Sequence, residues 1–351
     1  MAITSFSSAA KPASAPDATL ATDAEDTISA VSWSPASNHL AVASWDSKVR
    51  IYDVASSGKA NGVAMLSAEG PIFSCHWSKD GKMVLAGGAD KKPHLLDCPS
   101  GQQITVGSHD APIRSARFVD VPNSAAPIIA TGSWDKTIKF WDIRQQSPAA
   151  SLTCHDRVYG MDAKAGLLVA GTADLKLHLV DLKTPTTFFR TQDSSLKHQT
   201  KVVTVSPDGK GWATGSIEGR CAMNMVDEDD KSNTFSFKCH RSLPDKKGVT
   251  QIYTVNDVQF HPKHNKVVST AGSDGCFHFW DLGSRSRIGQ YNNLGGSITA
   301  SSFSKDGSMF VYAIGYDWSE GHAKNTPQYP NKLMFHSVND NDATPRAAKK
   351  F

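Results

Sequence analysis

The sequence of 351 residues predicts an all-β protein, a seven-bladed β-propeller, because one short phrase recurs along it at a nearly constant interval. Each copy has a run of small residues, an acidic turn and an apolar strand. The clear copies span residues 43–53, 87–97, 132–142, 171–181 and 271–281, and weaker copies span 215–225 and 314–322. A repeat of this kind predicts one structural module per copy.

The number of acidic turn residues gives the number of modules. They are Asp46, Asp90, Asp135, Asp174, Glu218, Asp274 and Asp317. Successive acids lie about 40–45 residues apart, with one longer interval after Glu218, and this spacing is similar to the period of WD40 repeats. The expectation is therefore a seven-bladed WD40 β-propeller.

Each module holds four short strands. Every acidic turn joins two strands, and a third lies upstream, as in 28–33, 113–119 and 255–260. The upstream strand is often followed by a Ser-Pro-Asp-Gly or Ser-Lys-Asp-Gly turn, a typical hairpin signal. Radial packing of such blades buries both faces of each sheet and leaves few open edges.

Both ends of the chain are expected to meet in the last blade. Residues 17–24 precede the first complete repeat and would supply an outer strand beside 298–303, 309–314 and 332–338. The expected division is a disordered tail over 1–16, a propeller over 17–338 and a flexible tail over 339–351. The first sixteen residues are rich in Ser, Ala and Pro and lack the apolar core of a signal peptide.

Composition excludes several classes of function. The net charge of +3 is small, and no stretch is apolar and long enough to cross a membrane. Six cysteines stand singly with no Cys-x-x-Cys pair, which favours core thiols in a reducing compartment over a disulfide frame. There is no phosphate loop and no metal-ligand spacing, so no cofactor and no metal is expected.

One set of residues has the types of a hydrolase triad. His109, Ser133 and Asp135 offer a base, a hydroxyl and an acid. Together with Trp141 they also match the hydrogen-bonded network that stiffens blades in WD repeats, and this structural interpretation is preferred. The protein is not expected to be an enzyme.

The turns predict a binding face. The residue before each acid projects there, and these residues are Trp45, Ala89, Trp134, Ala173, Ile217, Ser273 and Tyr316, with Trp318 close by. Exposed indoles are preferred anchors of protein interfaces, although they could equally pack on neighbouring loops. Two positions after the acids, Lys48, Lys92, Lys176 and Arg220 predict positive charge near the centre of this face.

The long interval between Val226 and Tyr253 predicts a second surface. It interleaves aromatic and basic residues, including Phe237 and Lys238, and a later loop adds Arg285 and Arg287. Cations follow phosphates and rings stack on bases, so this pattern is typical of single-stranded nucleic-acid binding. The alternative is that these charges are simply solvated.

These stretches resemble a known family. GSIEGR at 215–220, FKCHR at 237–241, QIYTVNDVQFHP at 251–262 and GSDGCFHFWD at 272–281 resemble the Gle/Rae messenger-RNA export propellers of the nuclear pore. They also resemble the sister Bub-type spindle-checkpoint propellers. The phrase YDWSEGH at 316–322 favours the export type.

The resemblance implies partners and their sites. It implies a nucleoporin with a glutamate-rich, hairpin-forming segment, bound by Arg220, Lys197, Trp45 and Trp134. It also implies a nucleic-acid groove made by Phe237, Lys238, Trp280, Arg285 and Arg287. Met225 replaces the Asp that closes the other clear repeats, so the geometry near Arg220 departs from the pattern.

The expected role is a non-enzymatic scaffold, a monomeric propeller in a heterocomplex at the nuclear pore that shuttles to the cytoplasm. Two alternatives stay open: a checkpoint adaptor that binds kinase segments, and a stand-alone protein that binds single-stranded RNA.

Overall fold

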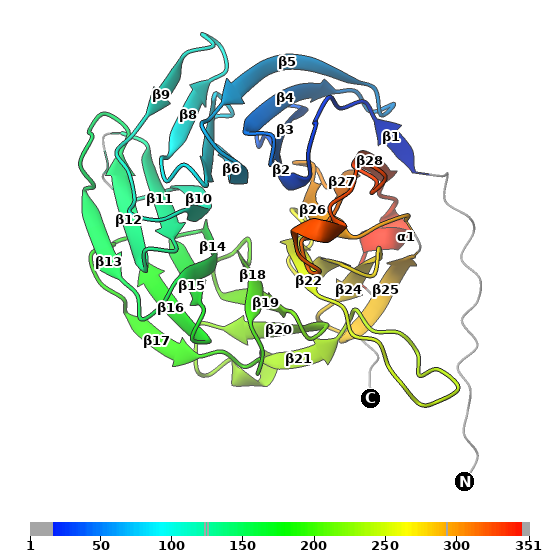
Figure 1. Ribbon diagram of the computed structural model, residues 1–351. Coiled ribbons are helices and arrows are strands. Elements are labelled where there is room, and N and C mark those ends of the chain that lie inside the picture. Colours follow the sequence, from blue (N-terminus) through cyan, green and yellow to red (C-terminus); the bar gives the residue numbers. More distant parts are fainter. Residues whose placement is uncertain (1–16, 123, 125, 293, 346–351) are drawn as a thin grey trace.

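The computed structural model describes residues 17–122, 124, 126–292 and 294–345. These residues form seven four-stranded antiparallel sheets arranged in a ring (Figure 1). The predicted propeller is therefore confirmed, with one sheet for each turn acid.

The first three blades follow the chain without interruption. Blade one has β2 (Ile28–Trp33), β3 (His39–Ser44), β4 (Lys48–Val54) and β5 (Ala60–Ser67). Blade two has β6 (Ile72–Trp77), β7 (Met83–Gly88), β8 (His94–Asp97) and β9 (Gln103–Thr105). Blade three has β10 (Ile113–Val119), β11 (Ile128–Ser133), β12 (Thr137–Asp142) and β13 (Ala150–Thr153).

The next three blades repeat this order. Blade four has β14 (Val158–Lys164), β15 (Leu167–Thr172), β16 (Lys176–Asp181) and β17 (Arg190–Asp193). Blade five has β18 (Thr200–Val205), β19 (Gly211–Ser216), β20 (Arg220–Met225) and β21 (Phe235–Lys238), with a 3-10 helix η1 (Lys231–Asn233) before its last strand. Blade six has β22 (Val255–Phe260), β23 (Val267–Gly272), β24 (Phe277–Asp281) and β25 (Ser286–Tyr291).

Blade seven joins the two ends of the chain, as predicted. It contains β26 (Ile298–Phe303), β27 (Met309–Ile314), β28 (Lys332–Ser337) and, from the start of the chain, β1 (Ala18–Leu20). Leu20 lies opposite Leu333 and is fully buried. The Asp17 carboxylate accepts hydrogen bonds from the Tyr312 hydroxyl at 2.7 Å and the His336 ring at 2.6 Å, which pins this strand to the blade.

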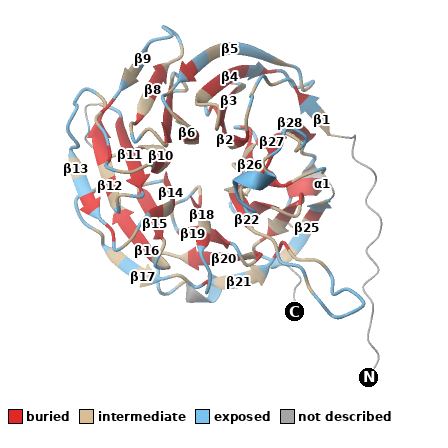
Figure 2. Cartoon of the chain, viewed as in Figure 1, coloured by how far each residue is buried: buried red, intermediate tan, exposed pale blue. Residues whose placement is uncertain are grey.

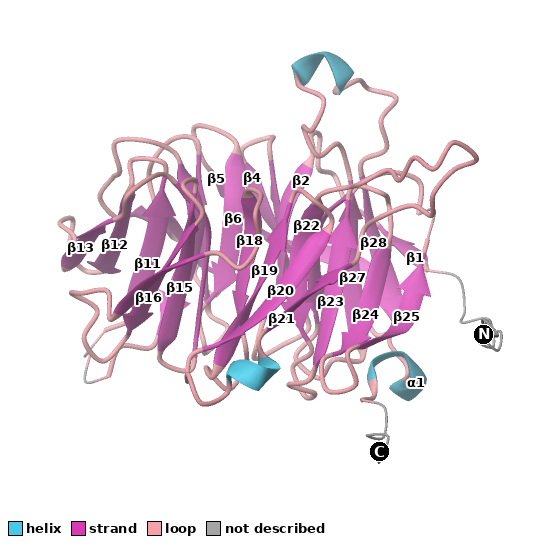
Figure 3. Cartoon of the chain, turned by 90° about the horizontal axis from the view of Figure 1, so that it is seen from below, coloured by secondary structure: helices cyan, strands magenta, loops and turns pink. Residues whose placement is uncertain are grey.

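Short helices stand at opposite faces of the disc (Figure 3). The loop between β27 and β28 carries η2 (His322–Lys324) above one face, and α1 (Asp340–Ala343) follows β28 at the other. Ala343 is buried, and the Tyr291 hydroxyl donates to Asp342 at 2.9 Å. Part of the expected C-terminal tail is thus folded against blade six, while 346–351 and the expected tail over 1–16 lie outside the described residues. None of the described helices has the length and hydropathy to span a membrane.

The core lies between neighbouring blades. The middle strands are almost entirely buried and the outermost strands are exposed (Figure 2). Strand β11, for example, is buried at every position, because both its faces pack on adjacent sheets. The apolar strands predicted from the sequence are stable in this setting because radial packing removes both faces from water.

The innermost strand of every blade has a β-bulge one residue after its start. The register of pairing shifts there in all seven blades, at Ser29, Phe73, Arg114, Tyr159, Lys201, Asn256 and Thr299. A bulge redirects a side chain and interrupts the ladder. These seven residues, called the bulge ring below, line the central channel.

Candidate docking face

The seven acidic turns share one geometry. The residue after each acid has a left-handed backbone, with φ between 62° and 70°. In most of these turns the acid accepts a backbone N–H two residues later, as Asp135 does from Thr137 at 2.9 Å. This side-chain-to-backbone bond explains why an acid recurs at the turn. All seven turns lie at the same end of their blades, and the face they form is called the turn face.

A buried hydrogen-bonded network stiffens blade three. The His109 ring joins the Asp135 carboxylate at 2.7 Å and the Thr131 hydroxyl at 2.7 Å, and the Trp141 indole also donates to Thr131 at 2.7 Å. Ser133 instead donates to the backbone carbonyls of Ala111 and Pro112. The hydroxyl that links His109 to Trp141 therefore belongs to Thr131, and the described part of the chain shows no hydrogen bond between Ser133 and the imidazole.

Blade six has the same network. His240 joins Asp274 at 2.9 Å and Thr270 at 3.0 Å, and the Trp280 indole donates to Thr270 at 3.0 Å.

The chemistry of these networks is structural. Burial lowers the pKa of His109, so its imidazole stays neutral near pH 7. In the described part of the chain no group of His, Cys, Asp and Glu is arranged to hold a metal ion.

Aromatic side chains form a continuous row on the turn face. Trp134 stacks near Phe73 at 5.9 Å between ring centroids, Phe73 contacts Trp45 at 5.3 Å, and Trp45 stacks on Trp318 at 4.3 Å. Trp134 remains 37% exposed. The sequence analysis missed Phe73, which belongs to the bulge ring rather than to a turn. Tyr316, expected to project, is buried and donates its hydroxyl to the Gly321 carbonyl.

The aromatic row forms the wall of a funnel that opens into the central channel. This cavity of about 190 Å³ is lined by Trp45, Phe73, Trp134, Trp318 and several residues of the bulge ring. A smaller cavity of about 100 Å³ lies further along the channel, and a third cavity of about 730 Å³ opens at the opposite face of the disc. All three follow the innermost strands, so the funnel is the turn-face mouth of the channel.

The positive charge at the centre comes from residues other than those predicted. Lys48, Lys92, Lys176 and Arg220 stand at or just before the third strand of their blades, outward of the channel, and none lines the funnel. Lys92 pairs with Glu69 at 3.0 Å and Lys176 with Asp193 at 2.6 Å. The prediction of their position was wrong because the third strand of a blade is separated from the channel by two others.

The cations that do line the funnel are Arg114 and Lys201, both partly buried members of the bulge ring. Burial, followed by repulsion from Arg114, lowers the pKa of Lys201 to about 8. Burial and the nearby Arg117 likewise lower the pKa of Arg114.

Arg220 and Lys197 lie on the turn face away from the funnel. Arg220 begins β20, and its Nε is 3.8 Å from the Glu218 carboxylate, which also lies 3.7 Å from the His198 ring. Lys197 is exposed in the loop before β18. Despite Met225, β20 keeps its pairing with both neighbours. The structure thus separates the four residues implied for partner binding into two indoles at the funnel and two cations over blade five.

Aromatic rings and guanidinium groups meet on the outer edge between blades five and six. The Phe237 ring lies 4.8 Å from Trp280, and Arg287 lies over Trp280 at 5.9 Å. Arg285 lies over Phe235, which the sequence analysis did not single out, at 4.6 Å. Both arginines are exposed, and so is Lys238, which lies opposite Arg220 in the sheet register. This set is called the outer groove.

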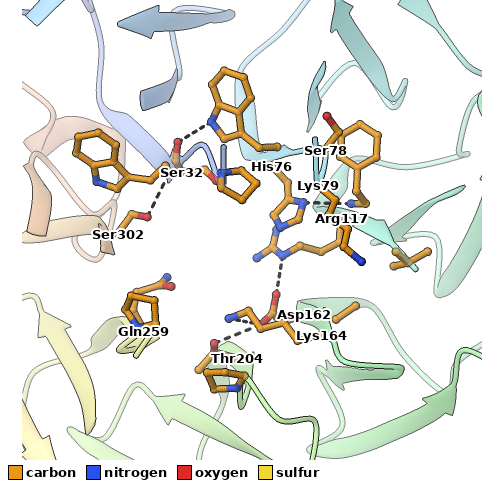
Figure 4. Close-up of a pocket in the computed structure, with 18 of the residues that line it drawn as sticks. Ser32, His76, Ser78, Lys79, Arg117, Asp162, Lys164, Thr204, Gln259 and Ser302 are labelled. Atoms are coloured by element: carbon orange, nitrogen blue, oxygen red, sulfur yellow. Dashed lines mark hydrogen bonds and ion pairs between the residues drawn. The ribbon is translucent and has the colours of Figure 1, made fainter. Parts of the chain in front are cut away.

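The opposite mouth of the channel is a closed polar network (Figure 4). Asp162 accepts from the Arg117 Nε at 2.8 Å, and its carboxylate lies 3.5 Å from the Lys164 ammonium. The His76 ring accepts the Phe118 N–H at 3.2 Å, and burial lowers the pKa of His76 to about 3, so it stays neutral. The charges of Arg117, Asp162 and Lys164 satisfy one another, which indicates a structural role.

A ring of seven four-stranded blades, stiffened by a hydrogen-bonded network of His, Asp, Thr and Trp, is typical of WD-repeat proteins. A family model described as "WD domain, G-beta repeat" matches residues 16–53, 62–97, 100–142 and 235–281. The chain belongs to the WD-repeat family that includes the mRNA export factors, as its similarity to individual members shows.

Three relatives illustrate the similarity. The chain is 47% identical to the mRNA export factor GLE2 of Chaetomium thermophilum over 95% of this chain and 94% of the relative. It is 45% identical to the WD40 repeat protein poxJ of Penicillium oxalicum over 95% of this chain and 96% of the relative. It is 44% identical to the Poly(A)+ RNA export protein of Schizosaccharomyces pombe over 95% and 94%.

Proposed function

We propose that the protein is a non-enzymatic scaffold that binds a glutamate-rich segment of a nucleoporin on its turn face and supports mRNA export. Two relatives at 44–47% identity are named for RNA export, which supports this assignment. In this proposal the protein is a monomeric propeller within a heterocomplex at the nuclear pore, and it shuttles between nucleus and cytoplasm.

The observation that carries the proposal is the pairing of a solvent-accessible aromatic row, with Trp134 exposed and the other rings half-buried, with a loosely held cation. Trp134 and Trp45 offer apolar area at the funnel, as interface anchors do. Arg220 is engaged only at 3.8 Å by Glu218, so its guanidinium can exchange this contact for a partner carboxylate. Lys197 adds a second exposed cation on the same face.

Charge reversal tests the proposal. Arg220→Glu should weaken binding of a synthetic glutamate-rich nucleoporin segment at least tenfold by calorimetry, because a like charge then faces the partner. Lys79→Glu is the control, since Lys79 is an exposed cation at the opposite mouth. Unchanged affinity in Arg220→Glu would refute this docking mode, and selective capture of checkpoint-kinase segments would favour the adaptor role instead.

The outer groove favours contact with single-stranded RNA as a second activity. Exposed Arg285 and Arg287 stand over the rings of Phe235 and Trp280, which combines charge for phosphates with faces for bases. Affinity for an RNA oligonucleotide should fall steeply with salt, and Arg287→Glu should reduce both the affinity and the slope. A flat salt response would contradict RNA binding by the isolated chain.

A further inference from the structure

One connection between blades is much longer than the others. The link from β21 to β22 runs over residues 239–254, and residues 241–252 of it form a hairpin that is called the arm below. The other links from an outer strand to the next blade run over 21–27, 68–71, 106–112, 154–157, 194–199 and 292–297. The arm, yellow-green in Figure 1, extends beyond the rim of the disc at the level of the turn face (Figures 1 and 3). An ordered connection of this length is typical of a functional element.

The arm is fixed in shape by its own hydrogen bonds. The Ser242 N–H donates to the Gln251 carbonyl at 3.0 Å. At the tip, the Asp245 carboxylate accepts the N–H groups of Lys247 and Val249 at 2.8 and 2.9 Å. Because these bonds hold the backbone, the side chains of the arm are presented to solvent in a defined arrangement.

The base of the arm is tied to two blades. The Arg241 guanidinium donates to the backbone carbonyl of Glu218, in blade five, at 2.7 Å. His240, the residue before it, is fully buried and belongs to the hydrogen-bonded network of blade six. The arm therefore projects from a stiff base.

The arm exposes aliphatic side chains to water. Leu243 is 89% exposed, Val249 is 55% exposed and Ile252 is 48% exposed. These are three of the eight large apolar side chains that are exposed in the described part of the chain, so they are clustered rather than scattered. A cluster of exposed apolar side chains on a well-held element is typical of an interface.

The charge of the arm indicates the kind of partner. Lys246 and Lys247 are exposed at the tip, whereas Asp245, the one carboxylate in 241–252, is engaged by the tip backbone. A lipid surface would meet these lysines before the aliphatic side chains, although membrane binding requires the apolar groups to enter below the headgroups. A protein surface with an apolar stripe bordered by carboxylates matches both features of the arm.

We propose that the arm binds an acidic amphipathic helix of a partner protein. The aliphatic side chains of Leu243, Val249 and Ile252 contact the apolar face of this helix, and the ammonium groups of Lys246 and Lys247 contact its carboxylates. A helix satisfies its own backbone and displays an apolar stripe bordered by charge. The arm shares no residue with the funnel or with the residues proposed to bind the nucleoporin segment, so this is a second surface that goes beyond the proposed function.

The test uses the full chain and three blocked synthetic peptides of about 20 residues, a length at which an isolated helix forms in water. Each peptide has leucines on one face, bordered by glutamate in the first, glutamine in the second and lysine in the third. Calorimetry should show that the glutamate peptide binds about tenfold more tightly than the glutamine peptide, and that the lysine peptide does not bind.

Variants of the arm locate the binding. Leu243→Ser, Val249→Ser and Lys246→Glu should each weaken binding of the glutamate peptide about tenfold. Val63→Ser is the matched control, because Val63 on β5 is 53% exposed, much as Val249 is on the arm, and this change should leave the affinity unaltered. All four positions are exposed, so the variants should keep the fold, and melting curves check this.

The outcomes separate this inference from the proposed function. Equal binding of the glutamate and glutamine peptides, or unchanged binding in Leu243→Ser, would overturn the inference. Binding to phosphatidylserine vesicles that depends on Leu243, without binding to any peptide, would overturn it in favour of a lipid surface. Arg220→Glu should leave the affinity for the glutamate peptide unchanged, and Leu243→Ser should leave the affinity for the nucleoporin segment unchanged. Loss of nucleoporin-segment binding in Leu243→Ser would show that the arm belongs to that docking mode and would overturn its separate role.

Discussion

Replacing Lys201 should make the free protein more stable, because its ammonium group is held where solvation is poor and no carboxylate is in contact. The pKa of Lys201 falls from its ordinary value of 10.5 to about 8 in the folded chain. Each unit of pKa corresponds to about 1.4 kcal/mol, so the upper limit of the penalty at pH 7 is about 3.5 kcal/mol. Because the side chain is only partly buried, we expect Lys201→Met to gain about 1–2 kcal/mol.

The pH dependence gives this prediction a characteristic sign. Between pH 8 and 10.5 the unfolded chain keeps the Lys201 proton while the folded chain loses it, so the stability of the parent protein rises over that window. The Lys201→Met variant lacks this pH-dependent contribution to stability. Its advantage should therefore be full below pH 8 and shrink towards pH 10. Arg114 and Asp317 also face Lys201: Arg114 lowers the pKa of Lys201 and Asp317 raises it.

Urea denaturation followed by far-ultraviolet circular dichroism at pH 7 and pH 10 measures the effect. A Lys201→Met protein that is less stable than the parent at pH 7 would refute the argument, because it would show that Lys201 supports the fold. A gain of equal size at both pH values would show that the added apolar contact, rather than charge, is responsible.

Two further predictions concern the fold. Leu20→Ala should destabilise the protein by about 2–5 kcal/mol, because the fully buried Leu20 side chain joins β1 to blade seven. The control, Val63→Ala on the exposed strand β5, should cost well under 1 kcal/mol. Equal midpoints of urea denaturation for the two variants would contradict closure by β1. Asp135→Ala should cost about 2–4 kcal/mol, because it removes the carboxylate that is the shortest contact of the buried His109 Nδ1 and leaves only the Thr137 hydroxyl at 3.1 Å, and a double-mutant cycle with His109→Ala should show coupling above about 1 kcal/mol.

The sequence alone predicted the features that arise from local interactions repeated in each blade. The turn acids recur because most of them cap their own turn, so Asp46 and Asp317 could be aligned without a structure. Closure by 17–24 followed from the number of strands left over for the last blade. The network around His109 was predicted in kind, but Thr131 rather than Ser133 carries the link, because Ser133, the last residue of β11, donates instead to the backbone carbonyls of Ala111 and Pro112.

The centre of the docking face could not be predicted in the same way. Whether a cation reaches the channel depends on which strand of the blade is innermost and on a bulge that redirects one side chain. Lys176 and Lys201 both stand at or next to the start of a strand, yet Lys176 pairs with Asp193 on an outer strand and Lys201 faces the channel. A signal was nevertheless present: the second residue of each first strand is the bulge position in all seven blades.

At the bulge position, some blades carry a residue that supports the ring and others carry a residue that can contact a partner. In blades one, six and seven it holds Ser29, Asn256 and Thr299, which tie neighbouring strands together through backbone carbonyls. In blades two to five it holds Phe73, Arg114, Tyr159 and Lys201, and the structure shows no such tie to the next blade there. Blades two to five thus present aromatic or cationic groups to the channel at this position, and Arg114 makes a 3.4 Å hydrogen bond back to the Phe73 carbonyl of blade two. Aromatic and cationic side chains are preferred anchors of protein interfaces. A partner that covers the channel mouth should therefore contact this half of the bulge ring together with the indoles of Trp45 and Trp134 at the funnel.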